Sequence, residues 1–130
     1  MAGFTDYLED KVLEHVFGGN AYSAPSTLYV ALYTVAPTDT GGGTEVSGGA
    51  YARQTAAFTV SGTNPTQASN SAAVEYPTAT ANYGTVVAVG IFDASSSGNL
   101  LAYANLTASK VVSTGDVFRF NSGDLDVTLA

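Results

Sequence analysis

Residues 26–34, STLYVALYT, and residues 85–92, TVVAVGIF, decide the fold. In the first stretch every second residue from Leu28 to Leu32 is aliphatic, and this period of two predicts a β-strand. The second stretch is apolar at odd and even positions alike. Such a run is typical of a central strand that is covered on both faces.

Outward from these two stretches, short apolar or alternating segments recur between turn-forming residues. The second stretch is predicted as a strand over 84–92, and the further strand candidates are 51–60, 68–76, 100–106, 109–113, 116–120 and 125–129. Turns are predicted at 61–67 and 93–99, where Gly, Ser and Asn gather. Strands spaced by turns about every 8–12 residues predict a mainly β fold, here a single β-sandwich, jelly-roll-like, of about eight short strands.

One amphipathic helix is predicted before the strands, over Asp6–Phe17, with Thr5 or Asp6 as its cap and a glycine stop at 18–19. Its apolar stripe consists of Phe4, Leu8, Val12 and Val16, widened by Leu13 and Phe17. This stripe must pack on something, either the protein's own sheet or a neighbouring subunit. We therefore expect two units, residues 1–20 as a helix docked on the body and residues 21–130 as the sandwich, with a Gly-rich exposed loop at 36–50.

Composition narrows the function. The chain has 130 residues, which suits one domain, and no cysteine, so it has neither disulfide nor thiolate chemistry. Eleven acidic residues against four basic ones give a net charge of −7. So few cations cannot drive binding to nucleic acid, and the acidity disfavours anionic membranes. We expect no cofactor, no nucleic-acid partner and no membrane partner.

Few residues offer chemistry. The single histidine, His15, lies on the predicted helix, where a surface position is a simpler interpretation than general-base catalysis. Asp124 and Asp126 share a strand face, which suits solvated acids or, alternatively, a hard cation such as calcium. The eight tyrosines are either half-buried strand residues, subunit contacts or a platform for a saccharide. No enzyme is predicted.

Four segments carry a family resemblance: YLEDKVLEHVFGG at 7–19, LYVALYTVAPTDTGGGTEVSGGAYARQ at 28–54, VGIFDA at 89–94 and GDLDVTL at 123–129. Together they resemble a family of small bacteriophage virion proteins that carry the labels tail fibre or capsid decoration. The resemblance implies a compact β fold, a place in the virion and no enzyme activity.

We therefore expect a structural protein on the outer surface of a virion that is assembled in the host cytoplasm. The first hypothesis is an external capsid decoration, or cement, protein that binds the major capsid protein and stabilises the assembled head. A homo-oligomer is expected, and a trimer would suit the three-fold positions of a capsid. The alternative is a tail-fibre or tail-associated module that recognises a glycan of the host surface.

The predicted interface lies on the helix and on the Gly-rich loop. Its candidate residues are Phe4, Leu8, Val12, Pro37, Asp39, Gly41, Gly42, Gly43, Glu45, Tyr51 and Arg53. If the loop is only an interface, shortening Gly41–Gly49 should abolish particle binding and leave the isolated fold intact. Leu32→Asp should instead unfold the protein, because it buries an unpaired carboxylate.

Overall fold

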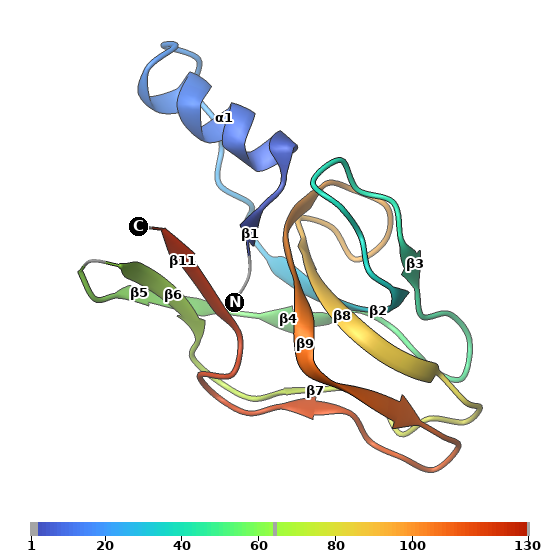
Figure 1. Ribbon diagram of the computed structural model, residues 1–130. Coiled ribbons are helices and arrows are strands. Elements are labelled where there is room, and N and C mark those ends of the chain that lie inside the picture. Colours follow the sequence, from blue (N-terminus) through green and yellow to red (C-terminus); the bar gives the residue numbers. More distant parts are fainter. Residues whose placement is uncertain (1–2, 64, 130) are drawn as a thin grey trace.

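The computed structural model describes residues 3–63 and 65–129 (Figure 1). Met1 and Ala2 of the predicted helical unit, Asn64 of the predicted turn 61–67, and Ala130 lie outside the described residues. The elements are β1 (Gly3–Phe4), α1 (Asp6–Val16), β2 (Leu28–Val35), β3 (Thr44–Glu45), β4 (Gln54–Ala56), β5 (Phe58–Ser61), β6 (Thr66–Asn70), β7 (Val74–Glu75), β8 (Gly84–Phe92), β9 (Leu100–Val112), β10 (Arg119–Phe120) and β11 (Asp126–Leu129). The mainly β fold class with one N-terminal helix is confirmed.

The largest sheet contains the two stretches that the sequence singles out. Its strands follow the order β1-β9-β8-β2-β3, and β4 pairs with β2 beside β3. All the pairings are antiparallel, with Ala31 opposite Gly90 at the centre of the β2–β8 pair. Strand β8 therefore lies between β9 and β2, as its apolar sequence predicts.

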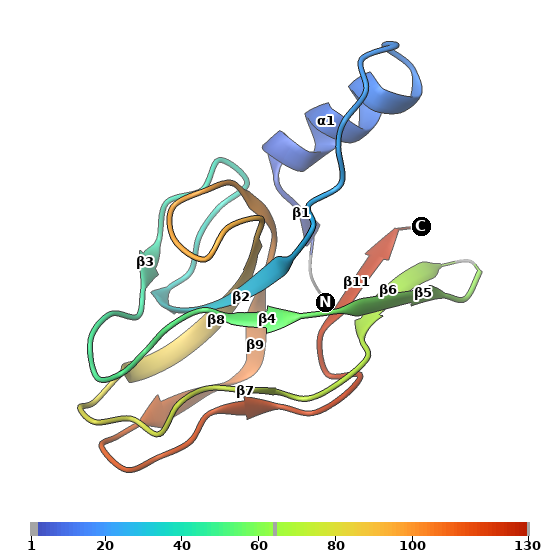
Figure 2. The same ribbon diagram turned by 180° about the vertical axis from the view of Figure 1, so that it is seen from behind.

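Two smaller groups of strands cover one face of this sheet: the pair β7–β10 and the three-stranded sheet β11-β6-β5 (Figures 1 and 2). The main core fills the space between the layers. Its buried members are Val30, Leu32, Val46, Val74, Tyr76, Ala79, Tyr83, Val86, Val89, Val112, Phe118, Phe120 and Leu125. Aromatic rings supply much of its volume: Tyr76 stacks on Tyr51 at 6.0 Å and meets Phe118 edge to face.

The opposite face of the large sheet carries a second buried cluster, which is made by Ala31, Tyr33, Ala88, Phe92 and Leu100. A β-bulge between Val86 and Ala88 shifts the register of β8 against β9, so these two residues belong to different clusters. From Val86 to Phe92, β8 is thus covered on both faces.

Several strand boundaries differ from the sequence prediction: the predicted strand 68–76 is divided between β6 and β7, and the predicted strand 116–120 is reduced to β10. Two further differences concern the large sheet. The predicted strand 51–60 is divided at Ala57, because β4 pairs with β2 in the large sheet whereas β5 pairs with β6 in the three-stranded sheet. The predicted strands 100–106 and 109–113 are one continuous strand, β9, whose irregular pairing with β8 absorbs the residues between them. Both corrections depend on pairing with distant strands, which local patterns do not reveal.

Candidate interface surfaces

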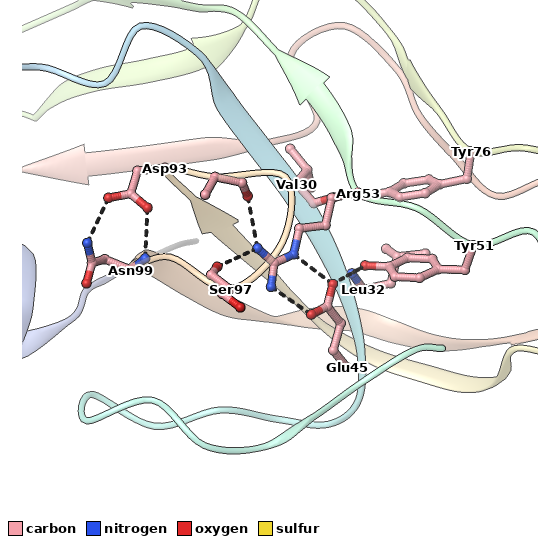
Figure 3. A network of polar contacts seen from close by, with 10 residues as sticks. Val30, Leu32, Glu45, Tyr51, Arg53, Tyr76, Asp93, Ser97 and Asn99 are labelled. Carbon is pink, nitrogen blue, oxygen red and sulfur yellow. Dashed lines mark hydrogen bonds and ion pairs between the residues drawn. The ribbon is translucent and has the colours of Figure 1, made fainter. Parts of the chain in front are cut away.

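A compact polar network joins the Gly-rich loop to the central sheet (Figure 3). Arg53 forms a bidentate ion pair with Glu45, with Nε and Nη2 donating to the two carboxylate oxygens at 2.9 and 2.8 Å. Tyr51 donates its hydroxyl hydrogen to the same carboxylate at 2.7 Å and accepts the backbone N–H of Leu32 at 3.0 Å. The side chains of Arg53 and Glu45 are only 7% and 26% exposed. The network therefore ties loop to strand away from bulk water.

Burial and the hydrogen bonds of this network shift the pKa values of its ionisable groups. Burial opposes ionisation of Glu45, but the hydrogen bonds from Arg53 and Tyr51 outweigh it and lower the pKa of the carboxyl below its ordinary 4.5. Burial and the bond to Glu45 raise the pKa of the Tyr51 hydroxyl. Burial also raises the pKa of Tyr33 to about 12. At neutral pH the network is one carboxylate, one guanidinium and neutral phenols.

Arg53 also fixes the turn after β8. Its Nη1 donates to the carbonyl oxygens of Ala94 and Ser97 at 2.9 and 2.8 Å, and its guanidinium lies 3.6 Å from the ring centroid of Phe92. The Asp93 carboxylate closes the same turn by accepting the backbone N–H of Asn99 (Figure 3). Three predicted interface residues, Glu45, Tyr51 and Arg53, therefore contact one another and hold two loops in place, a role that sequence reasoning did not assign to them.

The remaining loop residues are divided between the interior and the surface. Pro37 is buried, and Asp39 is exposed at the loop tip, where it accepts a hydrogen bond from the hydroxyl of Tyr103 at 2.5 Å. Gly41, Gly42 and Gly43 all have positive φ. Only at Gly43 would a side chain collide with the backbone, since its Cβ would lie 2.6 Å from a carbonyl oxygen. The tip of this loop, at residues 38–42, is exposed except for the partly buried Gly41, and residues 43, 44, 47, 48 and 50 are exposed as well.

The helix stands away from both layers of strands (Figures 1 and 2). No residue of α1 is buried, and Leu8 and Val12 are only half-buried. Phe4 and Val12 line a groove of about 520 Å³ with Glu9, Leu13 and Thr128. The sequence predicts that the helix packs either on its own sheet or on a neighbouring subunit. The structure shows packing on its own sheet only at the base of the helix.

The base of the helix is firmly attached. Thr5 is buried and donates its hydroxyl hydrogen to the carbonyl of Leu100 at 2.6 Å, while its own N–H bonds Leu101 at 2.9 Å. The same hydroxyl oxygen caps the helix by accepting the N–H of Leu8. The N–H of Asp6 donates to the carbonyl of Asp39, so the loop tip also contacts the start of α1.

We call residues 5–27 the arm, because α1 leads away from the body and residues 17–27 return along it (Figure 2). The return segment is held at the helix end: the N–H of Tyr22 donates to Nδ1 of His15 at 3.0 Å, and the Asn20 amide bonds the Glu14 carboxylate. His15 thus has a structural partner at the surface.

The arm carries apolar side chains that the predicted interface omitted. Leu13, Val16 and Phe17 are 58%, 60% and 83% exposed. All three belong to the apolar stripe of the predicted helix, so the sequence did indicate them as interface candidates. The prediction selected the half-buried base of the stripe, whereas the end of the helix is its most exposed part.

The other residues that offered chemistry have protein partners. Asp126 accepts hydrogen bonds from Ser69 at 2.6 Å and Gln67 at 3.2 Å, and Asp124 accepts the N–H of Asn121 at 2.9 Å. In the described residues, no three His, Cys, Asp or Glu side chains are placed to hold a metal. No helix in the described part of the chain has the length and apolar character needed to cross a membrane.

The described chain is thus a β-rich body with a projecting amphipathic arm. Residues 3–128 match the model of the family described as podophage GP4 fiber I protein gp80. The match covers nearly the whole chain, so the chain belongs to this family of phage fibre proteins. Among curated proteins, no match is found.

Family membership confirms the resemblance to phage virion proteins and makes this chain a virion-associated, structural protein of the fibre type. It agrees better with the fibre alternative than with the first hypothesis of capsid cement. The eleven predicted interface residues stay predictions, now divided by the structure among β1, the arm, the loop residues 37–43 and the internal network.

Proposed function

We propose that this protein is a structural module of a phage fibre that attaches to other virion subunits through its arm. One observation carries the proposal: α1 buries none of its residues in its own chain and exposes Leu13, Val16 and Phe17 together at its far end. An amphipathic helix in water is stabilised by packing its apolar face, and here the body supplies that packing only at the base.

The body holds the base of the arm in place, and the arm presents the apolar surface for binding. The base of the arm is bonded to β9 and to the loop tip, so its direction is set before a partner is met. Pre-organisation of this kind lowers the entropy that is lost on binding. The arm therefore acts as a fixed anchor.

Particle incorporation tests the proposal. Phe17→Asp places a charge in the exposed apolar end, and the particles should lose this protein while the purified variant keeps its fold. The matched control is Val60→Asp, because Val60 on β5 is equally apolar and exposed but lies away from the arm. Normal incorporation of Phe17→Asp protein into fibres would refute the role of the arm.

The cement hypothesis and the fibre proposal differ in copy number and place. A decoration protein would be present in proportion to the major capsid protein, whereas a fibre module would be present in few copies at the tail. Quantitative mass spectrometry of purified virions, with separate head and tail fractions, distinguishes them. The family description favours the tail.

A second candidate function, glycan recognition, has its own observation. A groove of about 300 Å³ between β9 and β11 has polar as well as apolar residues in its lining, and the polar ones include Asn105, Thr107, Asp124 and Asp126. Three of the eight tyrosines do not suit a saccharide platform, since Tyr33, Tyr76 and Tyr83 are buried.

Competition for the host surface tests this second function. Purified protein should block phage adsorption if the groove binds a host glycan, and a variant with Asn105→Ala and Thr107→Ala should lose that effect. Undiminished adsorption in excess wild-type protein would exclude glycan recognition by this module.

A further inference from the structure

The chain has four cationic side chains, Lys11, Arg53, Lys110 and Arg119, and their positions are uneven. Arg53 is used inside the body by its ion pair with Glu45. Lys11 lies on the arm, 5.6 Å from the ring centroid of Tyr7. Both remaining cations, Lys110 and Arg119, line one groove of about 340 Å³ at the end of β9.

We call this site the basic groove; its lining residues are Lys110, Val111, Val112, Asp116, Val117, Phe118 and Arg119. Two of its valines, Val111 and Val117, are 68% and 49% exposed. The Asp116 carboxylate accepts the N–H of Ser113 within the turn. Arg119 pairs at 3.2 Å with Glu75, but both side chains are more than half exposed, so this ion pair is weak and exchangeable.

The arm has the complementary character. Its described residues include four carboxylates, those of Asp6, Glu9, Asp10 and Glu14, against a single lysine. Of these carboxylates, Glu14 lies beside the exposed apolar end, whereas Asp6, Glu9 and Asp10 lie nearer the base of the helix. The arm and the basic groove also lie at opposite ends of the molecule, with α1 at the top of both views and the end of β9 at the bottom (Figures 1 and 2).

We infer that the arm of one copy docks in the basic groove of a second copy, so that the protein associates head to tail. This inference rests on the proposed function, in that it names the partner of the arm. Exposed valines would cover Leu13, Val16 and Phe17, and Lys110 and Arg119 would face the arm carboxylates. Contacts between unlike surfaces build a ring if the rotation closes and a filament if it does not.

Contact between two arms is a poorer arrangement for the same apolar end. It would bring two sets of carboxylates together without a cation beyond Lys11. Like charges at an interface suppress association. Among the described residues, Lys11 lies on the arm and Arg53 is paired with Glu45, which leaves Lys110 and Arg119. These two cations lie beside exposed apolar side chains in the basic groove.

Sedimentation velocity of the full chain over a range of concentrations tests this inference. Wild-type protein should form larger species as concentration rises, and added salt should weaken them, because exposed charges are screened. Phe17→Asp alone, and Lys110→Glu combined with Arg119→Glu, should each weaken association at least tenfold. Wild-type protein that stays monomeric up to about 1 mM would overturn the inference.

Two matched controls guard against general effects of charge. Lys11→Glu reverses a cation on the arm itself and should leave association intact or strengthen it. Val60→Asp adds an acid to an exposed valine outside both surfaces and should change nothing. Circular dichroism and thermal melting should change little in every variant, because none of the substituted side chains is buried and the Arg119–Glu75 pair is exposed.

Mixing the two interface variants gives the sharpest result. Phe17→Asp protein keeps its groove and the double groove variant keeps its arm, so an equimolar mixture should form dimers and stop there. Failure of the mixture to dimerise, or wild-type association by the groove variant, would overturn the inference. If Phe17→Asp is missing from particles while the groove variant assembles normally, the arm binds another subunit, and the proposed function stands without the head-to-tail contact.

Discussion

At the scale of single residues, Glu45 does more for this fold than its place in a Gly-rich loop suggests. One carboxylate accepts from Arg53 and Tyr51, and through them it is linked to β2 and to the turn at 93–99. Charge-assisted, bidentate pairs of this kind are the stronger hydrogen bonds of proteins. The network is therefore a point where stability can be measured residue by residue.

Replacing Glu45 by Gln should lower the free energy of unfolding at pH 7 by about 1–3 kcal/mol, because a charged acceptor is lost from a half-buried network. The folded pKa of Glu45 is lowered, so its stabilisation is present above 4.5 and is lost as the pH falls through the folded value. The difference between wild type and variant should therefore shrink in acid, as urea unfolding at several pH values would show.

The control for this prediction is Glu75→Gln. Glu75 also pairs with an arginine, but that pair is exposed, so the change should stay within about 0.5 kcal/mol. Equal losses for Glu45→Gln and Glu75→Gln would contradict the role given to the network.

The parity of β2 gives a second test. Leu32 is fully buried in the main core, whereas Val35, three residues further on, is more than half exposed. Leu32→Asp should cost more than about 3 kcal/mol and leave the protein unfolded or insoluble, and Val35→Asp should behave like wild type. A soluble Leu32→Asp variant with a wild-type circular dichroism spectrum would mean that the strand is placed wrongly.

At the scale of elements, the sequence predicts what depends on local pattern. The helix from Asp6, the alternation of β2 and the doubly buried β8 all follow from periodicity and are present in the structure. The division of 51–60 at Ala57 does not follow, because the chain changes partner strands there. The bonds from Arg53 to Ala94 and Ser97 cross more than forty residues, and no local pattern encodes them.

The Gly-rich loop illustrates the same limit. Its composition predicts free surface, yet it contains β3 and the buried Val46, whose N–H bonds the carbonyl of Leu32. Deleting residues 41–49 removes these groups together with Glu45. We therefore expect the shortened protein to unfold, contrary to the expectation from sequence, and a cooperative thermal transition near that of wild type would contradict this.

A finer comparison is available within the loop. Gly48 and Gly49 both have positive φ, but a Cβ at Gly48 would meet open space, whereas one at Gly49 would lie 2.7 Å from the carbonyl oxygen of Ala81. Gly48→Ala should cost about 1 kcal/mol for the left-handed backbone alone. Gly49→Ala should cost at least about 1 kcal/mol more. Chemical denaturation measures both, and equal costs would mean that the loop does not pack on Ala81.

At the scale of the whole molecule, the uneven distribution of charge and exposed apolar surface is what gives the fold a direction. The arm is acidic and apolar, and the far end of β9 holds the remaining cations beside exposed valines. Composition shows that cations are scarce but not that two of them lie in one groove. Lys110 and Arg119 line the same groove because the chain turns between β9 and β10. A fibre subunit with two unlike ends can repeat along an axis.

Chemical crosslinking tests this account directly, because the chain has only two lysines, one on the arm and one in the basic groove. Purified virions, and a mixture of isotopically light and heavy protein, would be treated with an amine-reactive linker and digested for mass spectrometry. In the isotope mixture, we predict a Lys11–Lys110 link that joins a light chain to a heavy chain. In virions, we predict the same Lys11–Lys110 link in the tail fraction. Links from Lys11 to the major capsid protein, without any Lys11–Lys110 link between copies, would contradict the account.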